Sequence, residues 1–186
     1  MSVNILDDRR KALEEEFFSR KDREAIEQMR AANAARTRRE ALAEASHISD
    51  DAVLTSLDAA GISPETLTAI SLIPLVVVAW ADGSVKDAER AAIEKAANDA
   101  GLNEAGVGLL DGWLTDRPSA QLLDSWKAYL GALKGTLPAG EYTALRDQIL
   151  NNARDVAAAA GGFLGIGAIS AAETRVLESL SNAFNG

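Results

Sequence analysis

Apolar residues after residue 48 recur at the spacing of amphipathic helices. Between residues 119 and 135, for example, Trp126, Leu130 and Leu133 follow one another at intervals of four and three residues, which places them on one helical face. No segment shows the sustained alternation of apolar and polar residues, enriched in β-branched side chains, that a half-buried strand requires. The pattern therefore predicts an all-α fold.

Helix-start and helix-stop residues divide this part of the chain into successive helices. Ser, Asn and Pro at helix starts and Gly at helix ends suit the terminal turns, whose backbone groups lack partners within the helix. These residues predict helices at 49–60, 63–81, 86–100, 104–114, 119–135, 140–160 and 170–184. We expect the second of these helices to kink at Pro74. Ser170 and Glu173 have the spacing of a capping box at the start of the last helix.

The first 48 residues differ from the rest in charge and in turn residues. They hold ten basic and ten acidic side chains with no Gly or Pro, whereas the remainder holds nine basic and eighteen acidic side chains. We therefore expect a long, charged helical arm at residues 1–48, followed by an all-α domain at residues 49–186. Asn33 is the position at which the arm would break.

The arm carries an intermittent stripe of large apolar residues. Its members are Leu6, Leu13, Phe17, Ile26 and Met29. Such a stripe is too thin to stabilise an isolated helix, because helices in water depend mainly on the packing of an apolar face. We therefore expect the arm to pack on the main domain, on a second copy of the chain or on a protein partner.

The net charge of −9 at pH 7 lies entirely after residue 48. Nucleic acids and anionic membrane surfaces attract an excess of Lys and Arg, so we expect no nucleic acid and no membrane-surface contact. The most apolar stretch, 67–81, contains polar residues and is shorter than the roughly 20 residues of a membrane-spanning helix, so we expect no transmembrane segment. Acidic and basic residues replace the apolar run of a signal peptide near the N-terminus, which favours a cytoplasmic protein.

The chain lacks the residues of several common active sites. It contains no cysteine, which excludes disulfides, thiolate metal sites and thiol nucleophiles, and its one histidine, His47, cannot supply the paired imidazoles of most catalytic zinc sites. It also contains no G-x-S-x-G nucleophile motif. We therefore expect a protein that is not an enzyme.

Two turns in the domain are related by an offset of 84 residues. The corresponding pairs are Gly83 and Gly167, Val85 and Ile169, Glu89 and Glu173, Ile93 and Leu177, and Glu94 and Glu178. The pattern indicates a duplicated helical hairpin, in which glycine permits the reversal and the glutamate lies in the first turn of the next helix. Only the first turn contains Asp82 and Asp87, so a ligand of the acidic residues would bind there.

The segment VVAWADGSVKDAERAAIEKAANDAGL, from Val77 to Leu102, resembles the TerB-like domains of tellurite-resistance proteins. The signature of that family is an apolar helix, an Ala-Asp-Gly turn, a Val or Ile, and a glutamate that opens the next helix. The matching residues are Ala81, Asp82, Gly83, Val85 and Glu89, and residues 161–184 form a degenerate second copy. Lys86 departs from the Ser or Thr that the family often has at that position, and the second copy lacks the aspartate.

The resemblance implies a TerB-like helical bundle of duplicated hairpins without catalytic machinery. It also implies a cytoplasmic protein linked to metal-related or membrane-associated stress complexes. Divalent-cation binding by clustered acidic residues is a further implication.

Asp82, Asp87 and Glu89 are the candidate metal ligands. Their segment matches the second half of a calcium loop, but Val78 and Trp80 stand where the first carboxylates would be, which excludes a standard EF-hand. The three carboxylates suit a weak, partly hydrated Ca²⁺ or Mg²⁺ site. The alternative is that Asp82 and Glu89 pair with the free backbone amides at the helix start.

Two functional hypotheses follow from the sequence. The first is a non-catalytic, stress-associated interaction module in which the arm binds a protein partner or a second copy, with a weak divalent-cation site at the Asp82-Gly83 turn. The second is a calcium- or magnesium-responsive sensor whose hinge is set by Asp82, Asp87 and Glu89. The sequence GGFLGIG at residues 161–167 lacks the Lys and Ser or Thr of a phosphate-binding loop, and we expect a connector there.

Overall fold

The computed structural model describes residues 3–159 and 169–185, with side chains described at residues 10–11, 16–159 and 169–185. Helices make up all the regular structure of these residues, so the predicted all-α fold is confirmed. The GGFLGIG segment, including Gly167, lies outside the described residues. The chain divides into two compact units, Met1–Glu40 and Ala41–Gly186. The second unit starts earlier than the predicted boundary, because Leu42 and Ile48 are buried in its core.

The first unit consists of a single helix that continues into the second. Helix α1 spans Val3–Ser46, a run of 44 residues without glycine or proline. The break expected near Asn33 is wrong, because the helix runs through that residue and the Thr37 hydroxyl donates to the Asn33 carbonyl at 3.1 Å. The helix ends at His47, whose backbone has a positive φ of 56°.

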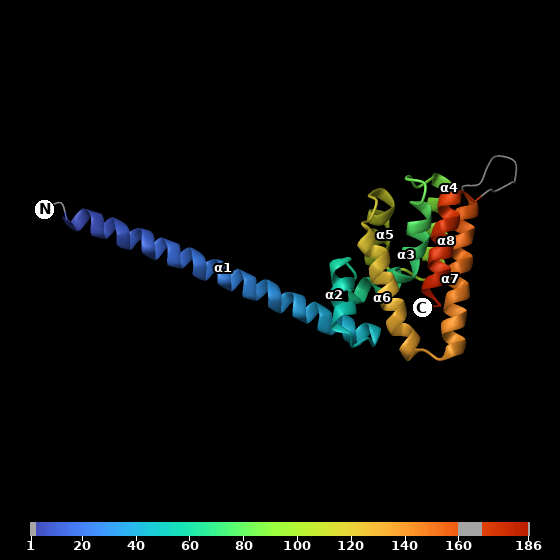
Figure 1. Cartoon of the computed structure of the whole chain (residues 1–186), viewed down its shortest axis with the longest axis horizontal. Coiled ribbons are helices and arrows are strands. Elements are labelled where there is room, and N and C mark those ends of the chain that lie inside the picture. The colour runs from blue at the N-terminus through green and yellow to red at the C-terminus, as the bar shows by residue number, and fades with distance from the viewer. Residues whose placement is uncertain (1–2, 160–168, 186) are drawn as a thin grey trace. The chain divides into compact units, whose positions relative to one another are not determined.

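The second unit, which we call the body, is built around one short apolar helix. After α1 come α2 (Asp51–Ala59), the 3₁₀ helix η1 (Pro64–Leu72), α3 (Ile73–Ala79), α4 (Asp87–Asp99), α5 (Glu104–Thr115), α6 (Ala120–Thr136), α7 (Ala139–Ala159) and α8 (Ala171–Ala183). Helix α3 packs against η1, α4, α6, α7 and α8, and lies among them in Figure 1. Six of its seven residues, including Leu75, Val76 and Val78, are buried, which makes α3 the centre of the core.

The segment predicted as one kinked helix at 63–81 consists instead of η1 followed by α3. Pro74 is in the first turn of α3, where its missing N–H costs nothing, and its ring is incompatible with a continuous α-helix through that point. In the preceding segment the Thr66 hydroxyl accepts from the Ser63 N–H at 2.8 Å, and the Ser71 hydroxyl donates to the Thr68 carbonyl at 2.8 Å. These side-chain bonds to the backbone favour the tighter helix there.

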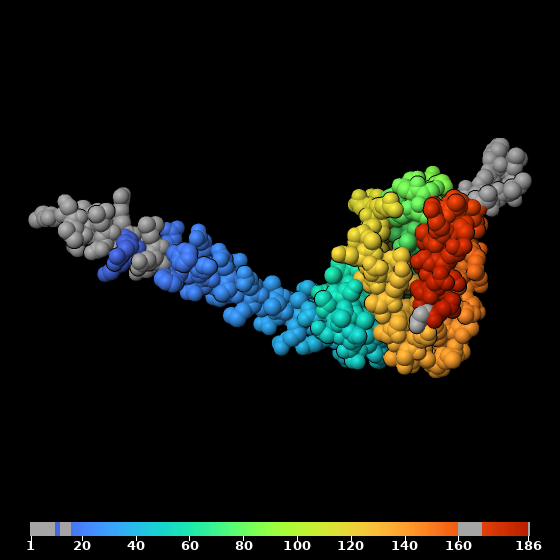
Figure 2. Space-filling view, in the orientation of Figure 1, coloured from blue at the N-terminus to red at the C-terminus, as the bar shows by residue number. Residues whose placement is uncertain are grey.

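Aromatic rings attach the C-terminal helix to the body. Phe184, directly after α8, packs edge-on against Trp126 of α6 at 5.6 Å and against Tyr142 of α7 at 5.8 Å between ring centroids. Figure 2 shows α8 running along one face of the body beside α7. This packing fixes the position of the other end of α8, where Ser170 and Glu173 lie.

No single helix among the described residues has both the length and the apolar composition of a membrane span. The pair Asp51–Ala59 and Pro64–Ala79, bent by 84°, meets those criteria only when its two parts are combined.

Candidate functional site at the turn between α3 and α4

The three predicted ligands lie in the turn between α3 and α4, which contains Asp82, and in the first turn of α4, which contains Asp87 and Glu89. Trp80 caps α3, and the chain reverses through Gly83, whose φ of 101° is a conformation that other residues rarely adopt. The Gly83 N–H donates to the Trp80 carbonyl at 3.1 Å. The Trp80 indole N–H donates to the Trp113 carbonyl at 2.8 Å, which ties this end of α3 to α5.

Asp82 is partly exposed and is engaged by a lysine. Its carboxylate accepts from the Lys86 ammonium at 2.7 Å and from the Ser84 backbone N–H at 3.4 Å. The hydrogen bond from Lys86 lowers the pKa of Asp82 below its ordinary value, and the same contact raises the pKa of Lys86. A cation at Asp82 would have to displace the Lys86 ammonium.

Glu89 is fully buried, with 0% of its surface exposed. Its Oε2 atom accepts from the Lys86 backbone N–H at 2.7 Å, which satisfies one of the free amides at the start of α4. Its Oε1 atom is buried without a hydrogen-bond partner among the described residues. Burial raises the pKa of Glu89 above its ordinary value, against the opposing effects of the Lys86 amide and ammonium, and the charges of Asp82 and Glu173 raise it further.

Asp87 does not join the other two acidic residues. It is exposed in the first turn of α4 and forms no hydrogen bond or ion pair with the described residues. More generally, the described part of the chain contains no group of three or more His, Cys, Asp or Glu residues arranged to hold a metal ion. Both Asp82 and Glu89 therefore contact Lys86, the first through the lysine ammonium and the second through the lysine backbone N–H, whereas Asp87 is exposed to solvent.

Glu173 is a second buried glutamate at a helix start, which the sequence did not single out as a site residue. It is 3% exposed, its Oε2 atom accepts from the Ser170 backbone N–H at 2.6 Å, and its Oε1 atom has no partner among the described residues. Its charge makes a small contribution to the raised pKa values of Glu89 and Lys86. The signal for Glu173 was present in the 84-residue offset from Glu89, and the signal for Lys86 was its i,i+4 spacing from Asp82.

Chemically, the site offers two buried carboxylates and one exposed ion pair. Each buried glutamate uses one oxygen as a helix cap, as the alternative interpretation of the sequence predicted for Glu89, and keeps the other free. Buried carboxylate oxygens without donors are costly unless a proton or a cation neutralises them. The chain matches no protein-family model, and no match was found among curated proteins or among solved structures.

Proposed function

We propose that this chain is a non-catalytic, TerB-like, stress-associated interaction module that associates through its N-terminal arm. The observation that supports the proposal is the distribution of exposed large apolar side chains. Among the described side chains these are Phe17 (46% exposed), Phe18 (62%), Ile26 (44%), Met29 (62%) and Val107 (49%), and only Val107 belongs to the body. Apolar side chains concentrated in this way are typical of a binding surface, whereas isolated ones are normal.

Three of the arm residues share one face of α1. Phe18 and Met29 are eleven residues apart, which is close to three helical turns, and Ile26 lies one turn before Met29. We call Phe18, Ile26 and Met29 the arm face. Phe17, which the sequence pattern grouped with Ile26 and Met29 in one stripe, lies on a different side of the helix, where Lys21 approaches its ring at 5.6 Å.

The charge distribution favours a second copy as the partner of the arm face. The first 48 residues have equal numbers of acidic and basic side chains, whereas residues 49–186 carry the whole net charge of −9. Two bodies therefore repel each other at low ionic strength, while two arms do not. Association of arms therefore buries the arm face without a charge penalty from the arms themselves.

The test is the molar mass of the full chain in solution, measured by light scattering over a range of concentrations. We expect a mass above that of the monomer, and a return to the monomer mass in the double variant Phe18→Gln and Met29→Gln. The matched control is Glu24→Gln with Ala31→Gln, two exposed positions on the opposite side of α1, which should leave the mass unchanged. A monomeric wild-type chain at every concentration would exclude self-association and assign the arm face to a different protein.

A second candidate, a calcium- or magnesium-responsive regulatory domain, has its own supporting observation. The Oε1 atom of Glu89 is buried without a hydrogen-bond partner among the described residues, in the first turn of the helix that follows Asp82, whose carboxylate is held by Lys86. A cation that replaced the Lys86 ammonium at Asp82 would keep a positive charge near the buried carboxylate of Glu89. In this function, Asp82, Asp87 and Glu89 set the hinge between α3 and α4.

Competition with Lys86 gives this second candidate a sharp test. Titration of the chelator-stripped protein with Ca²⁺ or Mg²⁺ should raise the melting temperature and change the tryptophan fluorescence, since Trp80 adjoins the turn. Asp82→Asn should abolish both effects, and Lys86→Gln should increase the cation affinity. Glu141→Gln, which removes an exposed acidic residue from the first turn of α7, is the control and should change nothing. Equal responses in all four proteins would reject a cation site at this turn.

A further inference from the structure

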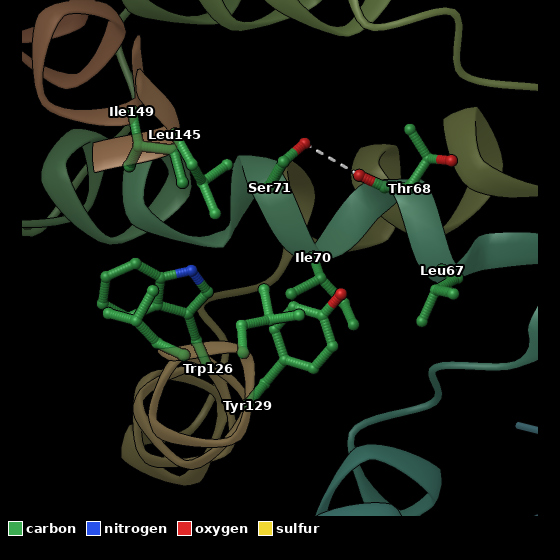
Figure 3. Close-up of a pocket in the computed structure, with 10 residues that line it drawn as sticks. Leu67, Thr68, Ile70, Ser71, Trp126, Tyr129, Leu145 and Ile149 are labelled. Atoms are coloured by element: carbon green, nitrogen blue, oxygen red, sulfur yellow. Dashed lines mark hydrogen bonds between the residues drawn. The ribbon is translucent and has the colours of Figure 1, made fainter. Parts of the chain in front are cut away.

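A pocket remote from the acidic turn lies between η1, α6 and α7. Its volume is about 290 Å³, close to the lower end of the range for small-molecule sites, which is about 300–1,000 Å³. Six Leu and Ile side chains, two aromatic rings and two hydroxyl-bearing side chains line it, and none of these residues is charged. Figure 3 shows the two rings, Trp126 and Tyr129, on the α6 side of the pocket, across from Ser71 and Thr68 of η1.

Two hydrogen-bond donors on α6 belong to this lining. Trp126 is 1% exposed, yet its indole nitrogen forms no hydrogen bond with the described residues, in contrast to Trp80, whose nitrogen donates to Trp113 at 2.8 Å. Figure 3 shows the nitrogen of Trp126 on the ring edge that faces η1. The Tyr129 hydroxyl also lacks a partner among the described residues, and burial raises its pKa above the ordinary value. Because Trp126 and Tyr129 are three residues apart on α6, both side chains project from the same helical face into the pocket lining.

The acceptors of the η1 wall do not serve these donors. The Ser71 hydroxyl donates to the Thr68 carbonyl at 2.8 Å, within its own helix. Buried indole N–H and tyrosine O–H groups usually have acceptors, so an apolar pocket with two free donors is complementary to a molecule that supplies an acceptor. The apolar lining provides the remaining binding energy through removal of the ligand surface from water.

Because no charged residue lines the pocket, a ligand with a neutral acceptor group is favoured over one with a charged acceptor group. A buried carboxylate or phosphate would lack a compensating cation, and its desolvation would cost several kcal/mol. A neutral carbonyl oxygen requires only the donors that the pocket offers. An apolar side chain of a protein would fill the same space but would leave both donors unpaired.

From these observations, we propose that the pocket between η1, α6 and α7 binds a small, neutral, apolar molecule through a carbonyl oxygen that accepts from Trp126 and Tyr129. This ligand site is independent of the arm and of the acidic turn. An experiment that rejects this ligand site would therefore leave the interaction function proposed above unaffected, and the converse also holds.

The experiment uses the full chain labelled with ¹⁵N and the neutral naphthyl ketone dye prodan as the probe. The three tryptophans give separate indole N–H resonances, which Trp→Phe variants assign. We expect saturable binding with a blue shift of the dye emission and a shift of the Trp126 indole resonance. The Trp80 resonance should stay in place, because that N–H is already bonded to Trp113.

Three variants separate the pocket from general surface adsorption. Leu67→Trp places a large ring at the half-buried rim and should abolish dye binding. Leu123→Trp, the same change at a half-buried position of α6 outside this pocket, should preserve it. Tyr129→Phe keeps the ring and removes one donor, and should weaken binding about twofold to tenfold.

Several results would overturn the proposal. One is the lack of saturable dye binding to the folded wild-type chain, and another is binding that Leu67→Trp leaves unchanged while its helix content matches the wild type. A Trp126 resonance that does not move would also reject it. Loss of self-association in Leu67→Trp, without dye binding to the wild type, would assign the pocket to a second copy instead.

Discussion

Glu89 and Glu173 occupy the same position, the third residue of a helix, at the starts of α4 and α8. Both are buried, and in each case one carboxylate oxygen accepts the backbone N–H of the residue before the helix, at 2.7 and 2.6 Å. The second oxygen of each has no hydrogen-bond partner among the described residues. Two segments far apart in the chain thus build the same buried, half-paired carboxylate.

The two helix starts differ in the residue before the helix. At α8, the Ser170 hydroxyl accepts the Glu173 N–H at 3.1 Å, which completes the reciprocal capping box. At α4, Lys86 has no side-chain oxygen, and its ammonium instead pairs with Asp82 at 2.7 Å. The start of α4 therefore lacks one of the two cap hydrogen bonds found at α8. In its place, Lys86 forms an ion pair with Asp82 at the surface. Departures from local sequence rules concentrate at functional sites, which is why the first turn is the better candidate for a site.

Removal of each glutamate is the strongest test of this comparison. Glu89→Ala leaves the start of α4 with no side-chain cap, whereas Glu173→Ala leaves the hydroxyl of Ser170 in place. We expect the free energy of unfolding to fall by about 2–3 kcal/mol for Glu89→Ala and by about 1–2 kcal/mol for Glu173→Ala. Urea unfolding followed by far-UV circular dichroism measures both. Equal losses would mean that Ser170 adds nothing to the cap.

The pH dependence of stability tests the buried charge of Glu89. Burial raises the pKa of Glu89 above its ordinary value of 4.5, so the folded state keeps the proton to a higher pH than the unfolded chain does. The stabilising contribution of protonated Glu89 to the free energy of unfolding is therefore fully present below about pH 4.5. It is lost as the pH rises through the pKa of Glu89 in the folded state. Glu89→Gln keeps a similar shape and cannot ionise.

We therefore expect the free energy of unfolding of the wild type, relative to Glu89→Gln, to fall between pH 4 and pH 7. The fall should be about 1.4 kcal/mol for each unit by which folding raises the pKa. Urea titrations of both proteins at a series of pH values give this difference. Glu141→Gln, at an exposed position of α7, should show no such trend, and a flat difference for Glu89→Gln would contradict burial of a charged carboxylate.

The sequence was sufficient to predict a helix boundary wherever that boundary depends on the capping residues next to it. The helix predicted at 104–114 runs from Glu104 to Thr115, and the Asn103 side chain accepts from the Gly106 N–H at 2.8 Å as its cap. The 63–81 segment was mispredicted because its 3₁₀ conformation depends on particular bonds from Thr66 and Ser71 to the backbone. Residue types alone do not distinguish these bonds from exposed hydroxyls.

The candidate site was predictable only in its local part. Asp82 and Glu89 were identified because they lie within eight residues of one turn. The proximity of Glu173 depends on the docking of α8, which Phe184 anchors against Trp126 and Tyr142. A single sequence gives only indirect evidence of such non-local packing. Here that evidence is the 84-residue offset between Glu89 and Glu173. The pocket beside Trp126 left none, because three separate helices form it.

Exchange of the residue before α4 is the mildest way to test the difference between the two helix starts. Lys86→Ser gives α4 the hydroxyl that Ser170 gives α8, a gain of about 1 kcal/mol, and removes an exposed ion pair worth about 0.2–1 kcal/mol. We expect a net rise of about 0.5 kcal/mol in the free energy of unfolding. Removal of the corresponding hydroxyl from the start of α8, by Ser170→Ala, should lower the free energy of unfolding by about 1 kcal/mol.

Salt separates the two contributions of Lys86→Ser. Added salt screens the Lys86–Asp82 pair of the wild type and leaves a neutral cap bond nearly unaffected, so the advantage of Lys86→Ser should grow with ionic strength. Urea unfolding of both proteins at low and high sodium chloride measures this trend. A variant less stable than the wild type at low salt and equal to it at high salt would show that the ion pair outweighs the missing cap. Lys86 would then stabilise the start of α4 through its ion pair with Asp82, and a serine hydroxyl at position 86 would add nothing.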